Sequence, residues 1–353
     1  MSSPPPSKRH RAASTDENLP LTVKRSSDLW LSDGTIILRT SDHASNVQTL
    51  FRVHKSTLAL HSTFFRDLFD GPQTAFDTAS ERYDDLPVMD MADDPKDVDD
   101  FLKAMYFPRY TSRHLGSTLQ DLDKSAFPGM YGGILRLCQK YDAPDIRGLV
   151  VDAIRKEWPE NLSIWDLRRQ ELDIARDGVE GNELAAITPK DVYPSPAQAI
   201  RLAMDFDIPE ILPVAFYDLA CHFMASPRES GHNSVTLLAP LSSNELQKLI
   251  VGMSALRDNL QNITSMNDGH DSCQELIKDW WATMHTQLYT DPDYIRLLFE
   301  RASGIGSHVG LRNVCSHCAG RLSTSLASKA VNTWAELPWF FDLKGIVGDH
   351  WGT

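Results

Sequence analysis

The sequence predicts an α+β domain, a small sheet capped by helices, followed by an all-helical region. Short apolar runs separated by turn residues fill the chain between Leu29 and Val53, which is typical of strands. From Ser56 onward the apolar residues recur with a helical period, and helical signals continue toward the C-terminus. No internal repeat is visible, which excludes solenoids and propellers.

The composition is that of a globular protein with an acidic body. Hydrophobic residues make up 42% and charged residues 24% of the 353 residues, enough for a sizeable core. The net charge is −13; the first 25 residues contribute +3, so the rest carries −16. Such a body repels phosphate backbones, and direct nucleic-acid binding is not expected. Without a long apolar run or a secretory signal, we expect an intracellular protein, nuclear or cytoplasmic, that does not enter a membrane.

Residues 1–26 are expected to form a disordered basic tail, because they are rich in Pro, Ser and charge and poor in large apolar groups. Their basic side chains are Lys8, Arg9, Arg11, Lys24 and Arg25. This spacing is compatible with a two-part nuclear import signal, and a solvated charged tail explains it at least as well.

The first strands are expected to form a hairpin. Leu29–Leu31 and Thr35–Leu38 flank Asp33-Gly34, a pair that suits a tight turn. A polar loop, 41–49, should lead to a third strand at Leu50–Val53.

One helix is expected from Ser56 to Phe69, followed by an acidic loop at 70–85 and a short edge strand at Leu86–Met89. A loop insertion at 108–127 and a loop-rich insertion at 167–190 are expected to interrupt the later helices. Six of those helices should begin at Asp94-Pro95, near Ile134 and at Pro144, Ser195-Pro196, Pro209 and Ser242. Three further helices should cover residues 273–288, 292–301 and 311–334.

A pattern of eight residues joins the predicted first strand, third strand and first helix: Asp28, Phe51, His54, Lys55, Leu58, Ser62, Phe65 and Phe69. In residue type and spacing it resembles the BTB/POZ domain, and the order of elements over residues 27–157 agrees. The resemblance implies a non-enzymatic protein-interaction module that usually pairs with a second copy of itself. We therefore expect a homodimeric scaffold that recruits other proteins.

In dimeric relatives the first strand and first helix form much of the two-fold contact. The residues implied here are Leu29, Trp30, Leu31, Thr57, Leu58 and His61. Packing of Trp30 inside its own domain is an equal alternative. Asp28 and Lys55 match the acid and base of a charged groove in repressor-recruiting relatives, although a structural ion pair explains them too. His54 is expected to be a hydrogen-bonded histidine at a strand-to-helix junction.

Residues 158–353, the predicted helical region, resemble the C-terminal region of fungal, basidiomycete-type BTB proteins. The stretches that carry this are Ile208–Tyr217, Cys315-x-x-Cys318 and Trp334-x-x-Leu337-Pro338, together with Gly133–Leu137 just before the region. Some relatives are substrate adaptors of cullin-type ubiquitin ligases and others are transcriptional regulators. Pro108–His114 lacks the hydrophobic-x-acidic motif of cullin binders, so the adaptor role is kept as the alternative.

One set of residues has the chemistry of a metal site. Cys315-x-x-Cys318 has the spacing of a zinc ligand pair, with Cys273 upstream and His285 and His317 as further candidates. A second complete ligand pair is lacking, and two reduced thiols on the first turn of an amphipathic helix explain the motif without a metal. We expect no cofactor, with a structural zinc as the alternative, and a metal-assisted enzyme in this region as the rival function.

Overall fold

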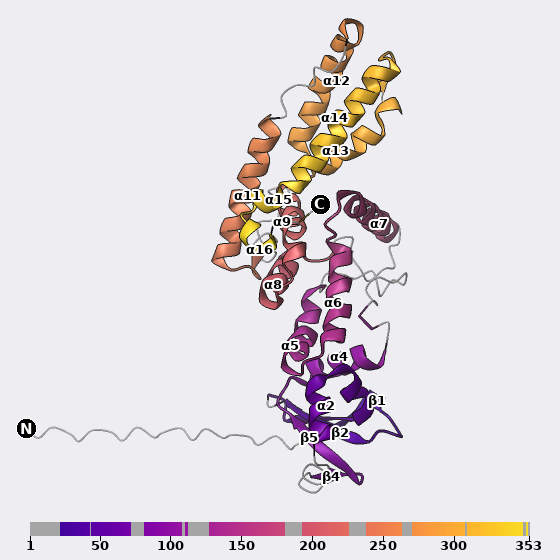
Figure 1. The fold of residues 1–353 in the computed structure, drawn as a ribbon, viewed down its shortest axis with the longest axis vertical. Coiled ribbons are helices and arrows are strands. Elements are labelled where there is room, and N and C mark those ends of the chain that lie inside the picture. Colours follow the sequence, from indigo (N-terminus) through magenta and orange to yellow (C-terminus); the bar gives the residue numbers. More distant parts are fainter. Residues whose placement is uncertain are drawn as a thin grey trace, which may run out of the picture. The chain divides into compact units, whose positions relative to one another are not determined.

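The computed structural model describes residues 22–42, 44–71, 81–107, 110–111, 127–180, 193–225, 238–262, 270–307, 309–348 and 351 (Figure 1). The chain divides into two compact units: unit 1 is Met1–Tyr106 and unit 2 is Phe107–Thr353. Within the described ranges, no helix has the length and apolar character needed to cross a membrane.

Unit 1 contains a five-stranded sheet with the strand order β1-β3-β2-β5-β4. Its strands are β1 (Thr22–Trp30), β2 (Ile36–Asp42), β3 (Val47–Val53), β4 (Arg82–Tyr83) and β5 (Leu86–Met91). β2 and β3 form an antiparallel hairpin, whereas β1 pairs with β3, and β5 with β2, in parallel. The predicted hairpin between the first two strands is therefore wrong: β1 pairs with the far side of β3.

Two segments predicted to be unstructured belong to the sheet. Thr22–Arg25 pair with Val47–Leu50, so the prediction of a disordered tail is wrong from Thr22 onward; residues 1–21 lie outside the described residues. The polar loop at 41–49 is also shorter than expected, because Ser41 pairs with Gln48 and Asp42 with Val47. Polar side chains misled the prediction in both segments; for Ser41 and Asp42 this is because one face of an antiparallel pair can be solvated.

The predicted helix from Ser56 to Phe69 is two helices, α1 (Lys55–His61) and α2 (Thr63–Asp70). Ser62 interrupts it with extended backbone angles, φ −139° and ψ 124°. Its side chain then caps α2 by accepting a hydrogen bond from the backbone N–H of Phe65 at 3.1 Å. The cap turns the chain while Leu58 and Phe65 both stay fully buried.

The last helix of unit 1, α4 (Pro95–Tyr106), begins where the sequence predicts. The Asp94 carboxylate accepts hydrogen bonds from the backbone N–H groups of Lys96, at 2.8 Å, and Asp97, at 3.2 Å. Val98, Phe101 and Leu102 on its buried face are fully shielded from solvent. A capping carboxylate followed by Pro thus fixes the start of this helix.

Unit 2 is helical throughout the residues described. Its helices are α5 (Gly132–Lys140), α6 (Pro144–Glu157), α7 (Leu162–Glu180), α8 (Pro196–Phe206), α9 (Leu212–Ala225), α11 (Ser243–Asn262), α12 (Asp271–Thr290), α13 (Tyr294–Ser303), α14 (Ser316–Ala335), α15 (Leu337–Phe340) and α16 (Lys344–Val347), with 3₁₀ turns at Gly129–Tyr131, Pro209–Ile211, Ile305–Ser307 and Val309–Leu311. The capping box at Ser242 and Glu245 is confirmed, because each backbone N–H donates to the other residue's side chain. Ser195 caps α8 as predicted, by accepting from Gln198.

The loop-rich insertion predicted at 167–190 is wrong over residues 167–180, which continue α7; residues 181–192 lie outside the described part of the chain. Aromatic rings hold this helix in unit 2. The ring of Trp165 lies 5.7 Å from that of Tyr217 in α9 and 5.0 Å from that of Trp334 in α14. Three helices distant in the sequence therefore share one aromatic core.

Candidate functional site

Three thiols and one imidazole converge at the N-terminal ends of α12 and α14 in unit 2. His270 is the N-cap residue of α12 and Cys273 lies in its first turn; Cys315 is the N-cap of α14 and Cys318 lies in its first turn. The ligand atoms of all four lie within 4.8 Å of one another. The structure thus brings together the three cysteines that the sequence selected. We call these four residues the thiol–imidazole cluster.

The contacts within the thiol–imidazole cluster are short. Cys318 Sγ lies 3.4 Å from Nδ1 of His270, and Cys315 Sγ lies 3.7 Å from its Nε2. Backbone N–H groups at the start of α14 donate to two sulfurs: Cys315 to Cys273 Sγ at 3.4 Å, and Cys318 to Cys315 Sγ at 3.5 Å. Cys273 and Cys318 are buried, Cys315 is half-buried and His270 is exposed, so the cluster is accessible from one side.

The helix terminus polarises the two cysteines of the Cys-x-x-Cys motif differently. The backbone N–H of Cys318 lowers the pKa of Cys315 to about 7, because this donor favours the thiolate. A backbone hydrogen bond of His270 lowers the pKa of Cys318, but burial and the neighbouring Cys315 outweigh it, so that pKa lies above its usual value. With no cation present, ionisation of one thiol therefore opposes ionisation of the other.

Sequence reasoning missed His270. The two histidines chosen instead lie outside the thiol–imidazole cluster: His285 is half-buried beside the rings of Trp281 and Tyr289, and His317 is exposed in a shallow hollow along α14. A signal was available, because His270-x-x-Cys273 repeats the spacing of Cys315-x-x-Cys318. His270 and Cys273 are therefore the second ligand pair that the sequence prediction lacked.

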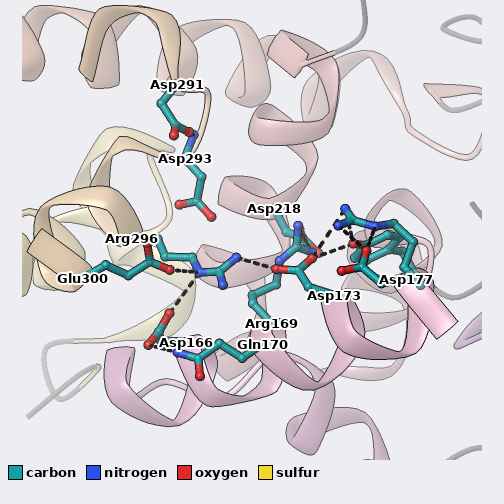
Figure 2. Close-up of polar contacts among 12 residues, drawn as sticks. Asp166, Arg169, Gln170, Asp173, Asp177, Asp218, Asp291, Asp293, Arg296 and Glu300 are labelled. Carbon is teal, nitrogen blue, oxygen red and sulfur yellow. Dashed lines mark hydrogen bonds and ion pairs between the residues drawn. The ribbon is translucent and has the colours of Figure 1, made fainter. Parts of the chain in front are cut away.

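A second polar feature of unit 2 is a buried ion network around Arg296 and Arg169 (Figure 2). Arg296, on α13, donates to Asp166 and Asp173 of α7, each at 2.9 Å. Arg169, also on α7, donates to Asp218 of α9 at 3.1 Å. Figure 2 shows these two arginines together with carboxylates from α7, α9 and α13. The network joins helices that the sequence separates by up to 130 positions.

Burial and pairing set the pKa values in this network. Burial raises the pKa of Asp218, but Arg169 and His222 outweigh it, so the pKa lies below its usual value. For Asp293 burial dominates: its pKa rises to about 6, although Arg169 and a hydrogen bond from the Tyr217 hydroxyl, at 2.7 Å, oppose the rise. Asp218 is thus held ionised, whereas the pKa of Asp293 is raised to about 6.

The sequence analysis missed this network because it interpreted the middle of α7 as a loop. The signal was present: Asp166, Arg169, Asp173 and Arg176 follow one another at helical spacing with alternating sign. The ion pairs of this network are made between the protein's own helices, so loss of one partner would leave a buried charge uncompensated.

In unit 1 the residues of the sequence pattern meet at the junction of β3, α1 and α4. The backbone N–H of His54 donates to the Tyr106 hydroxyl at 2.8 Å, and the His54 ring lies 3.2 Å from both that hydroxyl and an Asp33 carboxylate oxygen. His54 is therefore a hydrogen-bonded junction residue, as predicted. Phe51 and Ser62 are buried with Leu58 and Phe65, and the Phe69 ring stacks on Phe65 at 6.0 Å.

Comparison with known families identifies this part of the chain. A sequence model of the BTB/POZ domain matches residues 31–155. The chain contains a BTB/POZ domain. The match covers residues 31–106 of unit 1, α5 and nearly all of α6. The residues after it that the structure describes are mainly helical, whereas β1 precedes it. Neither the curated proteins nor the solved structures contain a match to this chain.

Two of the residues predicted for a BTB dimer contact are core residues instead. Leu29 and Leu58 are 0% exposed, so their side chains have no surface to offer a second chain. Trp30 is half-buried: the Arg25 guanidinium lies 4.4 Å above its ring and Tyr83 packs edge-on at 6.2 Å. Most of the Trp30 side chain is therefore covered within its own domain, as the alternative prediction for this residue has it.

The remaining candidates lie on the surface of the BTB domain. Leu31, Thr57 and His61 are half-buried. Asp28 is exposed and its carboxylate pairs with Lys103 of α4 at 2.9 Å. The Lys55 ammonium lies 5.6 Å from the centre of the Phe69 ring, a cation–π contact. The acid and the base predicted to line a groove thus both contact other parts of unit 1.

Proposed function

We propose that this protein is a self-associating scaffold that uses its BTB domain to form a homodimer and its helical region to recruit other proteins. The observation that carries the proposal is the BTB/POZ match at residues 31–155, because such domains mediate protein–protein interaction and self-association.

The first helix offers a surface for the dimer contact. Leu60 on α1 is 71% exposed and Phe64 on α2 is 42% exposed. Thr57, Leu60 and His61 follow one another at i, i+3 and i+4, so they share one side of α1. Exposed apolar side chains on the helix through which dimeric relatives pair are candidates for a covered contact. Leu60 and Phe64 therefore replace Leu29 and Leu58 in the proposed interface.

Light scattering on the full chain tests the dimer. We expect wild-type protein to have twice the mass of one chain at micromolar concentration. Leu60→Glu should weaken association by about tenfold or more, the effect of losing an interface hot spot. Ile250→Glu is the matched control, because Ile250 on α11 is 67% exposed and lies outside the proposed contact. A wild-type monomer at high micromolar concentration would refute self-association.

A groove in unit 2 supports recruitment by the helical region. It has a volume of about 340 Å³, and its apolar lining includes Phe223, Met253, Leu256, Leu260, Tyr289 and Tyr294. Phe223 and Tyr289 are partly exposed there, at 39% and 48%. Co-purification with mass spectrometry would identify the partner. A cullin among the captured proteins would favour the ligase-adaptor role, and chromatin proteins with a nuclear tagged chain would favour the transcriptional one.

We propose further that the protein is not an enzyme. The rival hypothesis requires a metal with a free coordination position near Cys273, Cys315 and Cys318. His270 adds a fourth protein ligand to this set, and a tetrahedral metal held by all four has no position for a substrate. The shallow hollow beside α14 is lined by neighbours such as Ser316 and His317 and by none of the four.

A further inference from the structure

The thiol–imidazole cluster has the dimensions of a tetrahedral metal site. Ligand bonds of about 2.3 Å for sulfur and 2.0 Å for nitrogen place neighbouring ligands roughly 3.5–3.8 Å apart. Cys318 Sγ lies 3.4 Å from Nδ1 of His270 and Cys315 Sγ lies 3.7 Å from its Nε2, so either ring nitrogen has a sulfur at this distance. With one ligand atom taken from each residue, the four atoms lie within 4.8 Å of one another. A metal ion can therefore occupy the centre with small movements of the side chains.

The ligand types select the metal. Three thiolates and one imidazole form a soft set that suits Zn²⁺, whereas Ca²⁺ and Mg²⁺ require oxygen ligands. A disulfide does not account for the arrangement: all five cysteines are unbridged, and a bond between any two of the three would leave the third thiol and His270 unused. The whole set of four is explained by one ion.

The groups around the three sulfur atoms stabilise negative charge on them, which favours binding of a cation. Backbone N–H groups of Cys315 and Cys318 donate to Cys273 Sγ and Cys315 Sγ, and such bonds orient metal-binding thiolates and stabilise their charge. Both ligand pairs begin a helix, where the positive end of the helix dipole favours negative sulfur. Three thiolates crowded together would repel one another without a counter-charge at their centre.

The position of the cluster indicates what the ion does. It connects the starts of α12 and α14, where Cys273 and Cys315 are 42 residues apart in the sequence. α13 lies between these helices in the chain and packs along α14 (Figure 1). Four protein ligands give a closed site of the structural type. We propose that His270, Cys273, Cys315 and Cys318 bind one structural Zn²⁺ that holds α12 and α14 together. This inference does not depend on the proposed dimer or scaffold role.

The test is zinc stoichiometry and affinity of the reduced full chain. We expect about one zinc ion per wild-type chain by elemental analysis, since the cluster supplies one tetrahedral set. Cobalt substituted for zinc should give the absorption of a tetrahedral thiolate complex. His270→Asn should weaken zinc binding by at least about tenfold in competition with a chromophoric chelator. His317→Asn should bind like wild type, because His317 is equally exposed and next to the cysteines but outside the cluster.

Cysteine variants provide the second comparison. Cys315→Ala should bind less than about a tenth of the wild-type zinc, whereas Cys138→Ala, which removes a buried thiol from α5, should leave it unchanged. Wild-type reduced protein that binds no stoichiometric zinc would overturn the proposal whatever the variants do. Equal zinc affinity of His270→Asn and His317→Asn would overturn the four-ligand assignment.

Discussion

The two units of this protein bury charge to different extents. Among the described residues the buried carboxylates of unit 2 are Glu157, Asp166, Asp218 and Glu245, each paired with an arginine. The buried carboxylate of unit 1 within the same ranges is Asp100, whose partner Lys96 is 73% exposed. Unit 1 places other pairs in solvent, as where Arg25 meets Asp84 with side chains 49% and 45% exposed.

The difference follows from how each unit is built. The core of unit 1 is built from apolar side chains of its strands, including the cluster of Ile37, Leu50 and Val88. Unit 2 packs long helices whose charged side chains meet between them, and the planar guanidinium of arginine can satisfy two carboxylates at once. Removing one partner should therefore cost far more in unit 2 than in unit 1.

The largest effect is expected from Asp218→Asn. This change leaves Arg169 and His222 without their buried counter-charge and should lower the free energy of unfolding by about 3–5 kcal/mol. Urea unfolding followed by tryptophan fluorescence measures it, because Trp30 is the only tryptophan of unit 1 and the other seven report on unit 2. A loss below about 1 kcal/mol would remove the distinction between the units.

Next in size is a pH effect centred on Asp293. Its folded pKa, about 6, lies above the unfolded value, so the folded state binds the proton more tightly. The resulting stability is complete below about pH 4 and is lost as pH rises through 6; it amounts to at most about 3 kcal/mol. Asp293→Asn should remove this component from the dependence of unfolding free energy on pH between 4 and 7. Identical profiles for wild type and variant would contradict the assignment.

A smaller effect is expected in unit 1 from Ser62→Ala. The hydroxyl caps α2, and its loss should cost about 1 kcal/mol, since Phe65 keeps its packing but loses a partner for its N–H. Hydrogen exchange of peptides from α1 and α2 should accelerate while those from α12–α14 stay unchanged. Ser56→Ala, at an exposed position of α1, is the matched control.

The smallest effect is expected from Asp84→Asn, which removes the exposed partner of Arg25. The urea midpoint should not change measurably, because solvent screens both charges and the Arg25 guanidinium keeps its contacts with Trp30 and Tyr83. A loss of unfolding free energy comparable to that of Asp218→Asn would show that buried and exposed ion pairs do not differ in their contribution to stability.

The starts of several helices could be predicted from nearby residues in the sequence, whereas the pairing of strands distant in the sequence could not. Asp94, Ser195 and the Ser242–Glu245 box mark helix starts through contacts within four residues, so the sequence is sufficient for them. The partner of β1 depends on contacts between residues about 25 positions apart, and a two-residue turn at Asp33-Gly34 suggested the wrong one. Polar residues within β2, β3 and α7 suggested loops, since solvated faces of strands and helices have the composition of loops.

The sequence by itself determined the BTB pattern from Asp28 to Phe69, the helical character of the C-terminal region and the Cys315-x-x-Cys318 pair. The tertiary structure decided which groups those elements meet: His270 with three thiols, Arg296 with the carboxylates of α7, and β1 with β3. The reason is physical. A cap or an amphipathic period acts over one helical turn, whereas a metal site or a buried ion network depends on where distant helices pack, and packing is set by the whole apolar core.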